Sequence, residues 1–536
     1  MLPSTLRAFP VGVVLLAAAC TAPSPEPERP SGTHQDLVTL FQEWREFERP
    51  ELVEEVPDYS AAAMEAQHRE LADWQTRLRA LDPSGWPRAE QIDWHLVRAE
   101  MNGLDFDHRV RRPWARDPAF YVMIYPAQSD VPAHEGPVIH GWIDTWTYDY
   151  PLGPEDAAVL AGRIGTVPAV LEQARVNLTG NARDLWHAGL RSFEGQSADL
   201  EALGQQVAGT DPALDAAIVA AREATDAFRD WLEAELPSRT GPSGVGKDNY
   251  TWYMQNVHLV PYTWEQLVTL MRRELARAHS SLLLEENRNR HLPELERIAS
   301  PEEYDRRLNA AVTEYMEFLE REEIHAIRDW MDPAVRAVNG RFTPADPDEI
   351  RNFFSEVTYR DPLAMRTHMH HWIELARMRE DPHPSPIRQG PSLYNIFDHR
   401  SEGLATAVEE MFMLMHAGLF DGRPRSRELI WIMVAQRAAR ALSGLYLHGN
   451  EFTMEEAVEH ASTWTPRGWL PDGDLVRFEQ QLYLRQPGYG TSYLSGKIQM
   501  EQLMAERALQ LGDEFTVGRF FDEIFDTGVI PFTLTR

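Results

Sequence analysis

Cysteine is almost absent from this sequence, since Cys20 is the only one among 536 residues. A single cysteine excludes an intrachain disulfide and a zinc site built from several thiolates. The chain also lacks a Gly-x-Ser-x-Gly elbow, and the segment Ser243-Gly-Val-Gly-Lys-Asp248 has neither the spacing nor the hydroxyl of a phosphate-binding loop. These absences argue against an α/β-hydrolase, a cysteine-dependent enzyme and a P-loop nucleotide-binding protein.

Basic residues are scarce relative to acidic ones. The chain has 52 lysines and arginines against 83 aspartates and glutamates, for a formal net charge of −31. Such a surface repels nucleic acid and anionic lipid, so we expect neither as a partner. A solvated surface that keeps an exported protein soluble explains the charge. It would also favour cationic ligands, although no acidic patch stands out in the sequence.

The N-terminus has the features of a bacterial export signal. Arg7 precedes a short apolar run, and Leu16-Ala-Ala-Ala-Cys20 resembles a lipobox, after which the cysteine carries a lipid. We therefore predict a signal peptide over residues 1–19 and a linker over residues 20–33, which is rich in proline, serine and threonine. Thr21 in place of aspartate favours the outer membrane, facing the periplasm. An ordinary cleaved signal with an incidental cysteine is the alternative.

Most of the remaining chain has the apolar spacing of helices, and few segments alternate like strands. Apolar residues recur every three or four positions over 60–81, 157–176, 214–236, 264–286, 302–330, 428–447 and 498–511. The sequence therefore predicts an all-α protein. A glycine- and proline-rich stretch at 237–248 suggests a boundary between an N-terminal helical region over 34–236 and a C-terminal one over 249–536. A single helical unit stays possible.

Histidines cluster in Arg366-Thr-His-Met-His-His-Trp372. If residues 363–380 form one helix, His368 and His371 share a face, whereas His370 points about 160° away from His368. The cluster therefore supplies at most two ligands to one ion, and catalytic zinc sites add a carboxylate from another element. Ordinary packing of the histidines explains the spacing equally well.

Carboxylates with suitable spacing follow at Asp398–Glu410. His399 and Glu402 are three residues apart, and Glu409 lies on the same helical face as Glu402. Inward carboxylates and histidines on neighbouring helices are how helical proteins build metal sites. A solvated or salt-bridged face is the alternative for both glutamates.

Several ordered stretches of the C-terminal half resemble the bacterial domain-of-unknown-function 885 family. They are Glu402-Gly403 continuing to Glu409, Arg437-Ala-Ala-Arg440 running to His448, Phe452 to Ala457, Pro487-Gly488 followed by Tyr493, and Gly528-Val-Ile-Pro531. The resemblance extends from about Tyr250 to the C-terminus. It implies a large helical architecture like that of zinc metallopeptidases of the glutamate-zincin type.

The chain departs from the family at one motif. The family carries His-Glu-x-x-Pro-Gly-His-His, in which histidines hold zinc and the glutamate is the general base. With the pair at His370-His371, the first histidine falls on Ala364 and the glutamate on Met365. Methionine accepts no proton from water, so only His370 and Glu402 carry over as metal ligands. His368, His371 and His399 are further candidates that could rebuild a zinc site with altered geometry.

Other residues could contribute chemistry. The resemblance gives Tyr493 and Glu409 as catalytic candidates, because a tyrosine hydroxyl can stabilise an oxyanion in such a pocket; packing beside Gly488 is the alternative. His134, Glu135 and His140 repeat the motif's spacing in an irregular segment, where chance explains them equally well. His448 either lines the pocket or ends its helix.

Taken together, the sequence favours a lipid-anchored hydrolase of metallopeptidase ancestry that cleaves peptide or amide bonds in the cell envelope. A descendant that binds a peptide or small molecule without catalysis is the alternative, because Ala364 and Met365 replace a ligand and the base. A purely structural envelope protein explains the anchor but not the Glu402-Gly403 and Tyr493 stretches. The substrate and the oligomeric state do not follow from the sequence.

Overall fold

The computed structural model describes residues 32–129, 132–344, 352–415 and 418–535. The predicted signal peptide, Cys20 and nearly all of the linker lie outside these described residues. Within the described ranges, no helix combines the length and hydropathy that a membrane span requires.

Helices form nearly all of the regular structure, which confirms the all-α prediction. The N-terminal half contains α1 (His34–Phe47), α2 (Ala61–Arg79), α3 (Arg88–Phe106), α4 (Pro113–Arg116), α5 (Pro154–Ile164), α6 (Val167–Asn177), α7 (Arg183–Val207) and α8 (Pro212–Glu235). The strands are two short pairs, β1 (Leu52–Val53) with β2 (Val56–Pro57) and β3 (Ile124–Tyr125) with β4 (Ile143–Asp144).

The C-terminal half is also helical. It contains α9 (Lys247–Asn256), α10 (Trp264–Asn289), α11 (Pro301–Arg321), α12 (Met331–Ala337), α13 (Phe353–Thr358), α14 (Pro362–His368), α15 (His370–Glu380), α16 (Asp398–Leu414), α17 (Pro424–His448), α18 (Met454–Trp464), α19 (Asp474–Arg485), α20 (Tyr489–Leu511), α21 (Val517–Asp526) and α22 (Phe532–Thr535).

Local sequence explains where helices begin and end. Thr453 caps α18 in a capping box with Glu456, as the spacing of a threonine and a glutamate three residues later would predict. The apolar pattern over 157–176 is divided between α5 and α6, because Pro168 has no backbone N–H and belongs to the first turn of a new helix. The pattern over 302–330 likewise ends early, at Arg321. Apolar periodicity therefore predicted which residues are helical, but it did not predict where one helix ends and the next begins.

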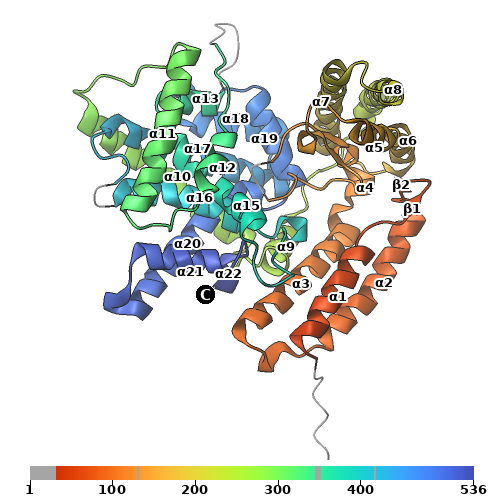
Figure 1. Cartoon of the computed structure of the whole chain (residues 1–536), viewed down its shortest axis with the longest axis horizontal. Helices are drawn as coiled ribbons and strands as arrows, with labels where there is room; N and C mark the ends of the chain where they lie inside the picture. Colours follow the sequence, from red (N-terminus) through yellow and green to blue (C-terminus); the bar gives the residue numbers. More distant parts are fainter. Residues whose placement is uncertain (1–31, 130–131, 345–351, 416–417, 536) are drawn as a thin grey trace, which may run out of the picture.

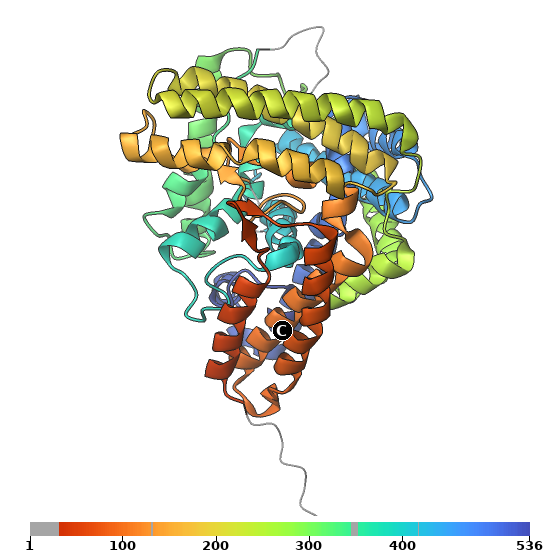
Figure 2. The same cartoon turned by 90° about the vertical axis from the view of Figure 1, so that its right-hand side faces the viewer.

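Two groups of N-terminal helices lie against the C-terminal half. Figure 1 shows α1, α2 and α3 side by side below the group α5 to α8, and Figure 2 shows α7 and α8 as long neighbouring rods. Leu37 and Leu96 of the first group share a hydrophobic cluster with Ile387 and Ile530. Residues from the two ends of the chain thus pack together.

The centre of the C-terminal half is the tightly packed pair α16 and α20. Gly403 on α16 faces Gly496 on α20, and a Cβ placed on Gly496 would overlap the His399 carbonyl oxygen. Only glycine allows the two backbones to approach this closely. This contact fixes the position of α16, which carries Glu402.

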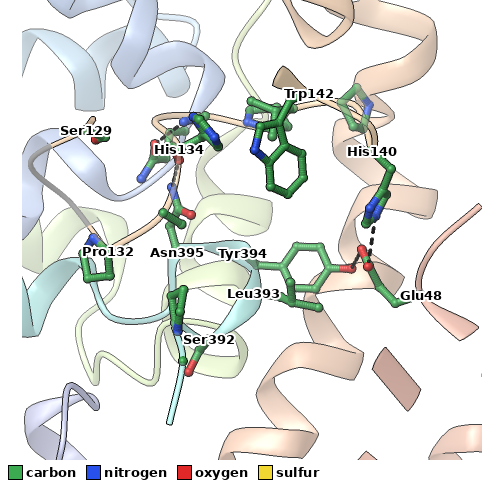
Figure 3. Close-up of a pocket in the computed structure, with 18 of the residues that line it drawn as sticks. Glu48, Ser129, Pro132, His134, His140, Trp142, Ser392, Leu393, Tyr394 and Asn395 are labelled. Atoms are coloured by element: carbon green, nitrogen blue, oxygen red, sulfur yellow. Dashed lines mark hydrogen bonds and ion pairs between the residues drawn. The ribbon is translucent and has the colours of Figure 1, made fainter. Parts of the chain in front are cut away.

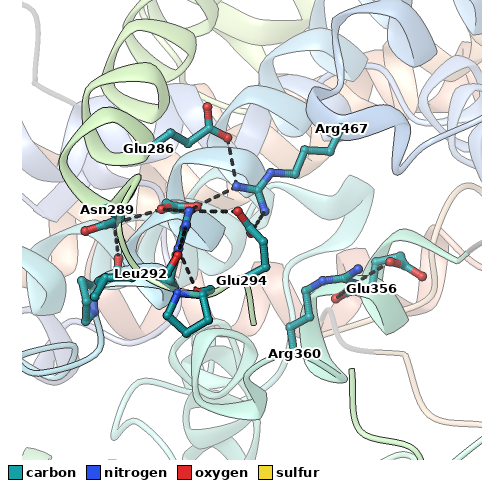
Figure 4. Close-up of polar contacts among 11 residues, drawn as sticks. Glu286, Asn289, Leu292, Glu294, Glu356, Arg360 and Arg467 are labelled. Atoms are coloured by element: carbon teal, nitrogen blue, oxygen red, sulfur yellow. Dashed lines mark hydrogen bonds and ion pairs between the residues drawn. The ribbon is translucent and has the colours of Figure 1, made fainter. Parts of the chain in front are cut away.

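The start of α17 is held by a polar network that Figure 4 shows in part. Glu428 accepts hydrogen bonds from Asn289 at 2.9 Å, from Arg425 at 2.9 Å and from Arg467 at 2.6 Å. Arg467 also donates to Glu286 at 2.9 Å. The network joins the end of α10 to the first turn of α17.

We expect Gly496→Ala to destabilise the fold by about 1–3 kcal/mol or more, because the added methyl group meets backbone that cannot move aside cheaply. Gly195→Ala is the matched control. Gly195 also lies in a helix, α7, but an added Cβ there meets no atom within 4 Å, so alanine should stabilise by about 0.4–1 kcal/mol. Urea unfolding of the Gly496→Ala and Gly195→Ala variants tests this prediction. Equal free energies of unfolding would contradict the close approach of α16 and α20 at Gly496.

Candidate metal site and adjacent cavity

The histidine cluster lies at a break between two helices. The single helix supposed over 363–380 is in fact α14 and α15, separated at Met369, whose backbone has φ −65° and ψ 5°. His368 ends α14, and His371 lies in the first turn of α15. The break leaves these two histidines neighbours, with ring centroids 5.0 Å apart.

His368, His371 and Glu402 converge in the interior. One potential ligand atom from each lies within 4.8 Å of those of the other two, and all three side chains are buried. The His368 Nε2 and Glu402 Oε2 atoms are 3.5 Å apart. Two histidines and one glutamate are the protein ligands of a common type of catalytic zinc site, so the donor set fits that ion.

His371 has an unusual environment for a buried polar side chain. Neither ring nitrogen has a hydrogen-bond partner among the described residues, although the residue is completely buried. Burial, reinforced by the nearby His368 and Arg437, lowers the pKa of His371 well below its ordinary value. The ring is therefore neutral, which is the form that binds metal. An unsatisfied buried imidazole costs stability unless something binds it.

Neighbouring polar groups orient two members of this group. The Tyr489 hydroxyl donates a hydrogen bond to Glu402 Oε1 at 3.0 Å. Glu409 Oε1 lies 3.0 Å from His368 Nδ1, and Glu409 accepts two hydrogen bonds from Arg437 at 2.6 and 2.8 Å. A proton on His368 Nδ1 that is donated to Glu409 leaves the Nε2 lone pair facing Glu402. Such outer partners fix the ligands of metal sites.

The Glu409 carboxylate is ionised. Burial raises its pKa, but the charges and hydrogen bonds of Arg437 and His368 outweigh burial and lower the pKa below its ordinary value. Because Arg437 occupies both carboxylate oxygens, Glu409 is placed to orient His368 rather than to take a proton from water. Tyr493, the other predicted catalytic residue, stacks beside His368 with ring centroids 6.2 Å apart.

The structure places two predicted ligands elsewhere. His370 Nδ1 lies 2.6 Å from the Tyr315 hydroxyl, and its Nε2 lies 3.0 Å from His325 Nε2. His399 Nδ1 lies 3.4 Å from His258 Nδ1. Of the predicted ligands, His371 and Glu402 therefore meet, whereas His370 and His399 belong to separate buried pairs.

Apolar packing surrounds the two motif positions that differ from the family. Ala364 and Met365 are buried in the largest hydrophobic cluster, together with Ile373, Leu404 and Val408. Met365 therefore fills core volume at the place where the resemblance puts a general base.

A cavity of about 630 Å³ shares helix α15 with this group, and Figure 3 shows part of its lining. Leu375, one turn beyond His371 on α15, forms part of its wall, about 6 Å along the helix axis. Gln486 also lines the cavity, accepts a hydrogen bond from the Gly136 backbone at 2.6 Å, and donates to Asp398 at the start of α16. The cavity and the buried group thus share α15, and Gln486 links the cavity wall to the start of α16.

The histidines of the irregular segment line the same cavity but do not form one site. His134 Nε2 lies 3.1 Å from Asp144, and His140 Nε2 lies 3.1 Å from Glu48. His448, at the end of α17, instead contacts the Tyr483 carbonyl oxygen at 2.9 Å. The motif-like spacing of His134, Glu135 and His140 therefore produces two separate histidine–carboxylate pairs.

The four predicted ligands were His370, His371, His399 and Glu402, whereas sequence reasoning named His368 only as a residue that could help rebuild an altered site. The family alignment put a proline at this position, whereas the three-residue spacing to His371 was the available signal. Tyr489 and Arg437 carried no such signal, because each contacts a residue distant in the sequence.

The fold and the buried group define a large all-helical protein with two histidines and a glutamate converging between α14, α15 and α16. The chain belongs to the family described as "Bacterial protein of unknown function (DUF885)", whose profile matches residues 48–360 and 371–536. The match therefore includes most of the N-terminal half, whereas the resemblance read from the sequence covered only the chain from about Tyr250 onward. The unmatched residues 361–370 contain Ala364, Met365 and His368.

Two solved structures share the fold. A presumed lipoprotein of unknown function from Shewanella oneidensis has a TM-score of 0.66 and 14% sequence identity, covering 94% of this chain and 99% of its own. A presumed lipoprotein from Colwellia psychrerythraea has a TM-score of 0.61 and 13% identity, covering 94% of this chain and 97% of its own. No curated protein matches the chain.

Proposed function

We propose that the protein is a lipid-anchored bacterial envelope hydrolase of metallopeptidase ancestry, with zinc bound by His368, His371 and Glu402. The observation that carries this proposal is the convergence of these three side chains around a fully buried histidine, His371, whose ring nitrogens have no hydrogen-bond partner among the described residues. A bound cation would satisfy that imidazole and neutralise the buried carboxylate.

The anchor rests on the sequence and on the structural relatives. Cys20 ends a lipobox-like stretch and precedes a proline-rich linker, and both structural relatives are described as presumed lipoproteins. The protein would then be held at the outer membrane, facing the periplasm, through a lipid on Cys20.

Each neighbouring residue has a role in this proposal. When bound, zinc polarises a carbonyl group and acidifies water. Glu409 orients His368, Tyr489 orients Glu402, and Tyr493 is close enough to His368 to contact a bound substrate. Met365 supplies no general base, so we expect slow cleavage of peptide or amide bonds. A general base ordinarily contributes about 10²–10⁴-fold.

A non-catalytic binding protein is the second candidate. The packing of Ala364 and Met365 into the hydrophobic core supports it, because neither position can regain a ligand or base without rebuilding that core. In this case the cavity beside α15 would hold a peptide or small molecule without cleaving it.

Hydrolysis measurements distinguish the two candidates. The mature chain would be loaded with zinc and incubated with a library of fluorogenic peptides, beside His371→Ala and a control, His291→Ala, which changes an exposed histidine. Zinc-dependent cleavage that His371→Ala abolishes and His291→Ala retains supports the hydrolase. Bound zinc without cleavage of any peptide supports the binding protein and contradicts the hydrolase.

Tyr489→Phe should weaken zinc binding by about 10–100-fold, the usual effect of removing a partner of a metal ligand. The variant loses the hydroxyl that donates to Glu402 Oε1 and keeps the ring. Competition with a chromophoric chelator measures the affinity. An unchanged affinity would show that Glu402 needs no help from Tyr489 or does not bind the metal.

A further inference from the structure

A second carboxylate, that of Glu48, lies partly buried at the large cavity. Its Oε2 lies 3.1 Å from His140 Nε2, and its Oε1 accepts a hydrogen bond from the Tyr394 hydroxyl at 3.2 Å. Figure 3 shows the three side chains meeting at one end of the cavity. The Glu48 side chain is 13% exposed. These contacts come from α1, the segment before β4 and the segment before α16.

Glu48 has no arginine or lysine partner in the part of the chain that the structure describes. Two arginines of the cavity wall are paired elsewhere, since Arg45 pairs with Glu100 and Arg111 with Asp107. Among the described residues, Glu48 receives one side-chain contact on each oxygen, although a carboxylate can accept about four hydrogen bonds. It therefore keeps capacity for another donor.

The Glu48 carboxyl is ionised at neutral pH. Burial raises its pKa, but the hydrogen bond and charge of His140, the charge of Arg45 and the Tyr394 hydroxyl together lower it below the ordinary value. A partly buried anion that has a histidine beside it, but no arginine or lysine, can still gain from a cationic ligand.

The rest of the cavity favours a cation with an apolar body. Aromatic side chains form much of its wall, among them Tyr59, Trp114, Phe120, Trp142 and Tyr394. Aromatic faces attract cations, and a volume of about 630 Å³ is within the range of pockets for drug-sized ligands. The formal charge of −31 also raises the local concentration of cations.

We propose that Glu48 binds the primary ammonium group of a peptide held in this cavity, and that His140 and Tyr394 position its carboxylate. This inference names a substrate class for the proposed hydrolase. Only the cleavage of the bound peptide rests on the proposed function; the binding of its ammonium group does not. The peptide's N-terminus and a lysine side chain present the same chemistry. Arg49 and Arg379 also line the cavity and are exposed, so preference for a peptide without an amine would favour an anionic ligand instead.

Calorimetry on the mature chain, with metal removed by a chelator, tests the inference without any catalysis. Three peptides serve as probes: Leu-Ala-Ala-amide, acetyl-Leu-Ala-Ala-amide and acetyl-Lys-Ala-Ala-amide. We expect the unblocked peptide to bind at least about tenfold more tightly than its acetylated form, because an ammonium–carboxylate hydrogen bond is lost on acetylation. Binding of the acetyl-lysyl peptide assigns the site to a side chain, and its failure assigns it to the N-terminus.

Two variants locate the effect. Glu48→Gln keeps the shape and removes the charge, so it should abolish the preference for the amine. Glu46→Gln, two residues away with a side chain 75% exposed, should leave it unchanged. The comparison between peptides on the unaltered protein needs no variant and stands even if Glu48→Gln unfolds, which thermal unfolding would reveal.

Three results would overturn the inference: binding of acetyl-Leu-Ala-Ala-amide as tight as that of both amine-bearing peptides, an amine preference that survives Glu48→Gln, or no binding of either amine-bearing peptide. Failure here is distinct from failure of the proposed function. Amine binding by a protein that takes up no zinc and cleaves no peptide would leave the inference standing and contradict the hydrolase, whereas zinc-dependent cleavage without amine preference would do the reverse.

Discussion

Lowering the pH from about 7.5 to about 5.5 should remove on the order of 5 kcal/mol from the free energy of unfolding. Four buried histidines outside the proposed metal site cause the loss. Burial is the largest influence on each, and it lowers the pKa of His325 and His399 to about 3, that of His448 to about 4, and that of His258 well below its ordinary value.

The direction follows from proton binding. Below about pH 6.5 the unfolded chain takes up protons on these histidines, whereas the folded chain keeps them neutral. The stability they contribute is therefore complete above pH about 6.5 and falls as the pH drops toward their folded pKa values. Each histidine loses about 1.4 kcal/mol of this stability in total between about pH 7.5 and about pH 5.5. The total is comparable with the whole stability of an ordinary domain.

Urea unfolding at the two pH values measures the effect. His448→Gln should reduce the pH-dependent loss by about 1.4 kcal/mol, because one neutral buried histidine is gone. His291→Gln changes an exposed histidine and is the control. The same unfolding free energy at both pH values would mean that these histidines are accessible to protons in the folded protein.

Glu409→Ala should destabilise the fold by about 3–5 kcal/mol, because it leaves the Arg437 guanidinium buried without its carboxylate. The pair is almost completely enclosed, with side-chain exposures of 3% for Arg437 and 0% for Glu409. Removing the glutamate also takes a partner from His368 Nδ1. Chemical unfolding monitored by circular dichroism measures the loss.

Two further variants separate the buried pair from a general effect of removing glutamate. Glu65→Ala breaks an exposed pair with Arg69, whose side chains are 76% and 66% exposed, and should change stability by less than about 1 kcal/mol. Glu409→Leu combined with Arg437→Met should recover most of the loss, since no charge stays buried alone. If Glu409→Ala lowers the free energy of unfolding no more than Glu65→Ala does, the Arg437 guanidinium must reach solvent, which would contradict a buried pair.

Much of the helical fold could be predicted from local pattern. Apolar periodicity marked α2, α8, α10 and α17, and the capping box located the start of α18. The break at Met369 could not be predicted, because neither proline nor glycine interrupts the histidine cluster. It depends on packing of α14 and α15 against other helices.

The candidate site was only partly predictable for the same reason. The spacing of His368 and His371 indicated a shared face, and Glu402 stood on a second helix at a family position. Choosing between Glu402 and Glu409 required the location of Arg437, which is 28 residues from Glu409. The contact between Glu48 and Tyr394 spans 346 residues, so no local pattern could reveal it.

The zinc content of the purified mature chain tests the central claim most directly. Zinc would be measured by mass spectrometry after dialysis, beside Glu402→Gln, His371→Ala and the control His291→Ala. We predict about one zinc ion per chain in the unaltered protein and the control, and almost none in the two site variants. No bound zinc after it has been offered in excess, or equal zinc in all four proteins, would contradict a metal site at His368, His371 and Glu402.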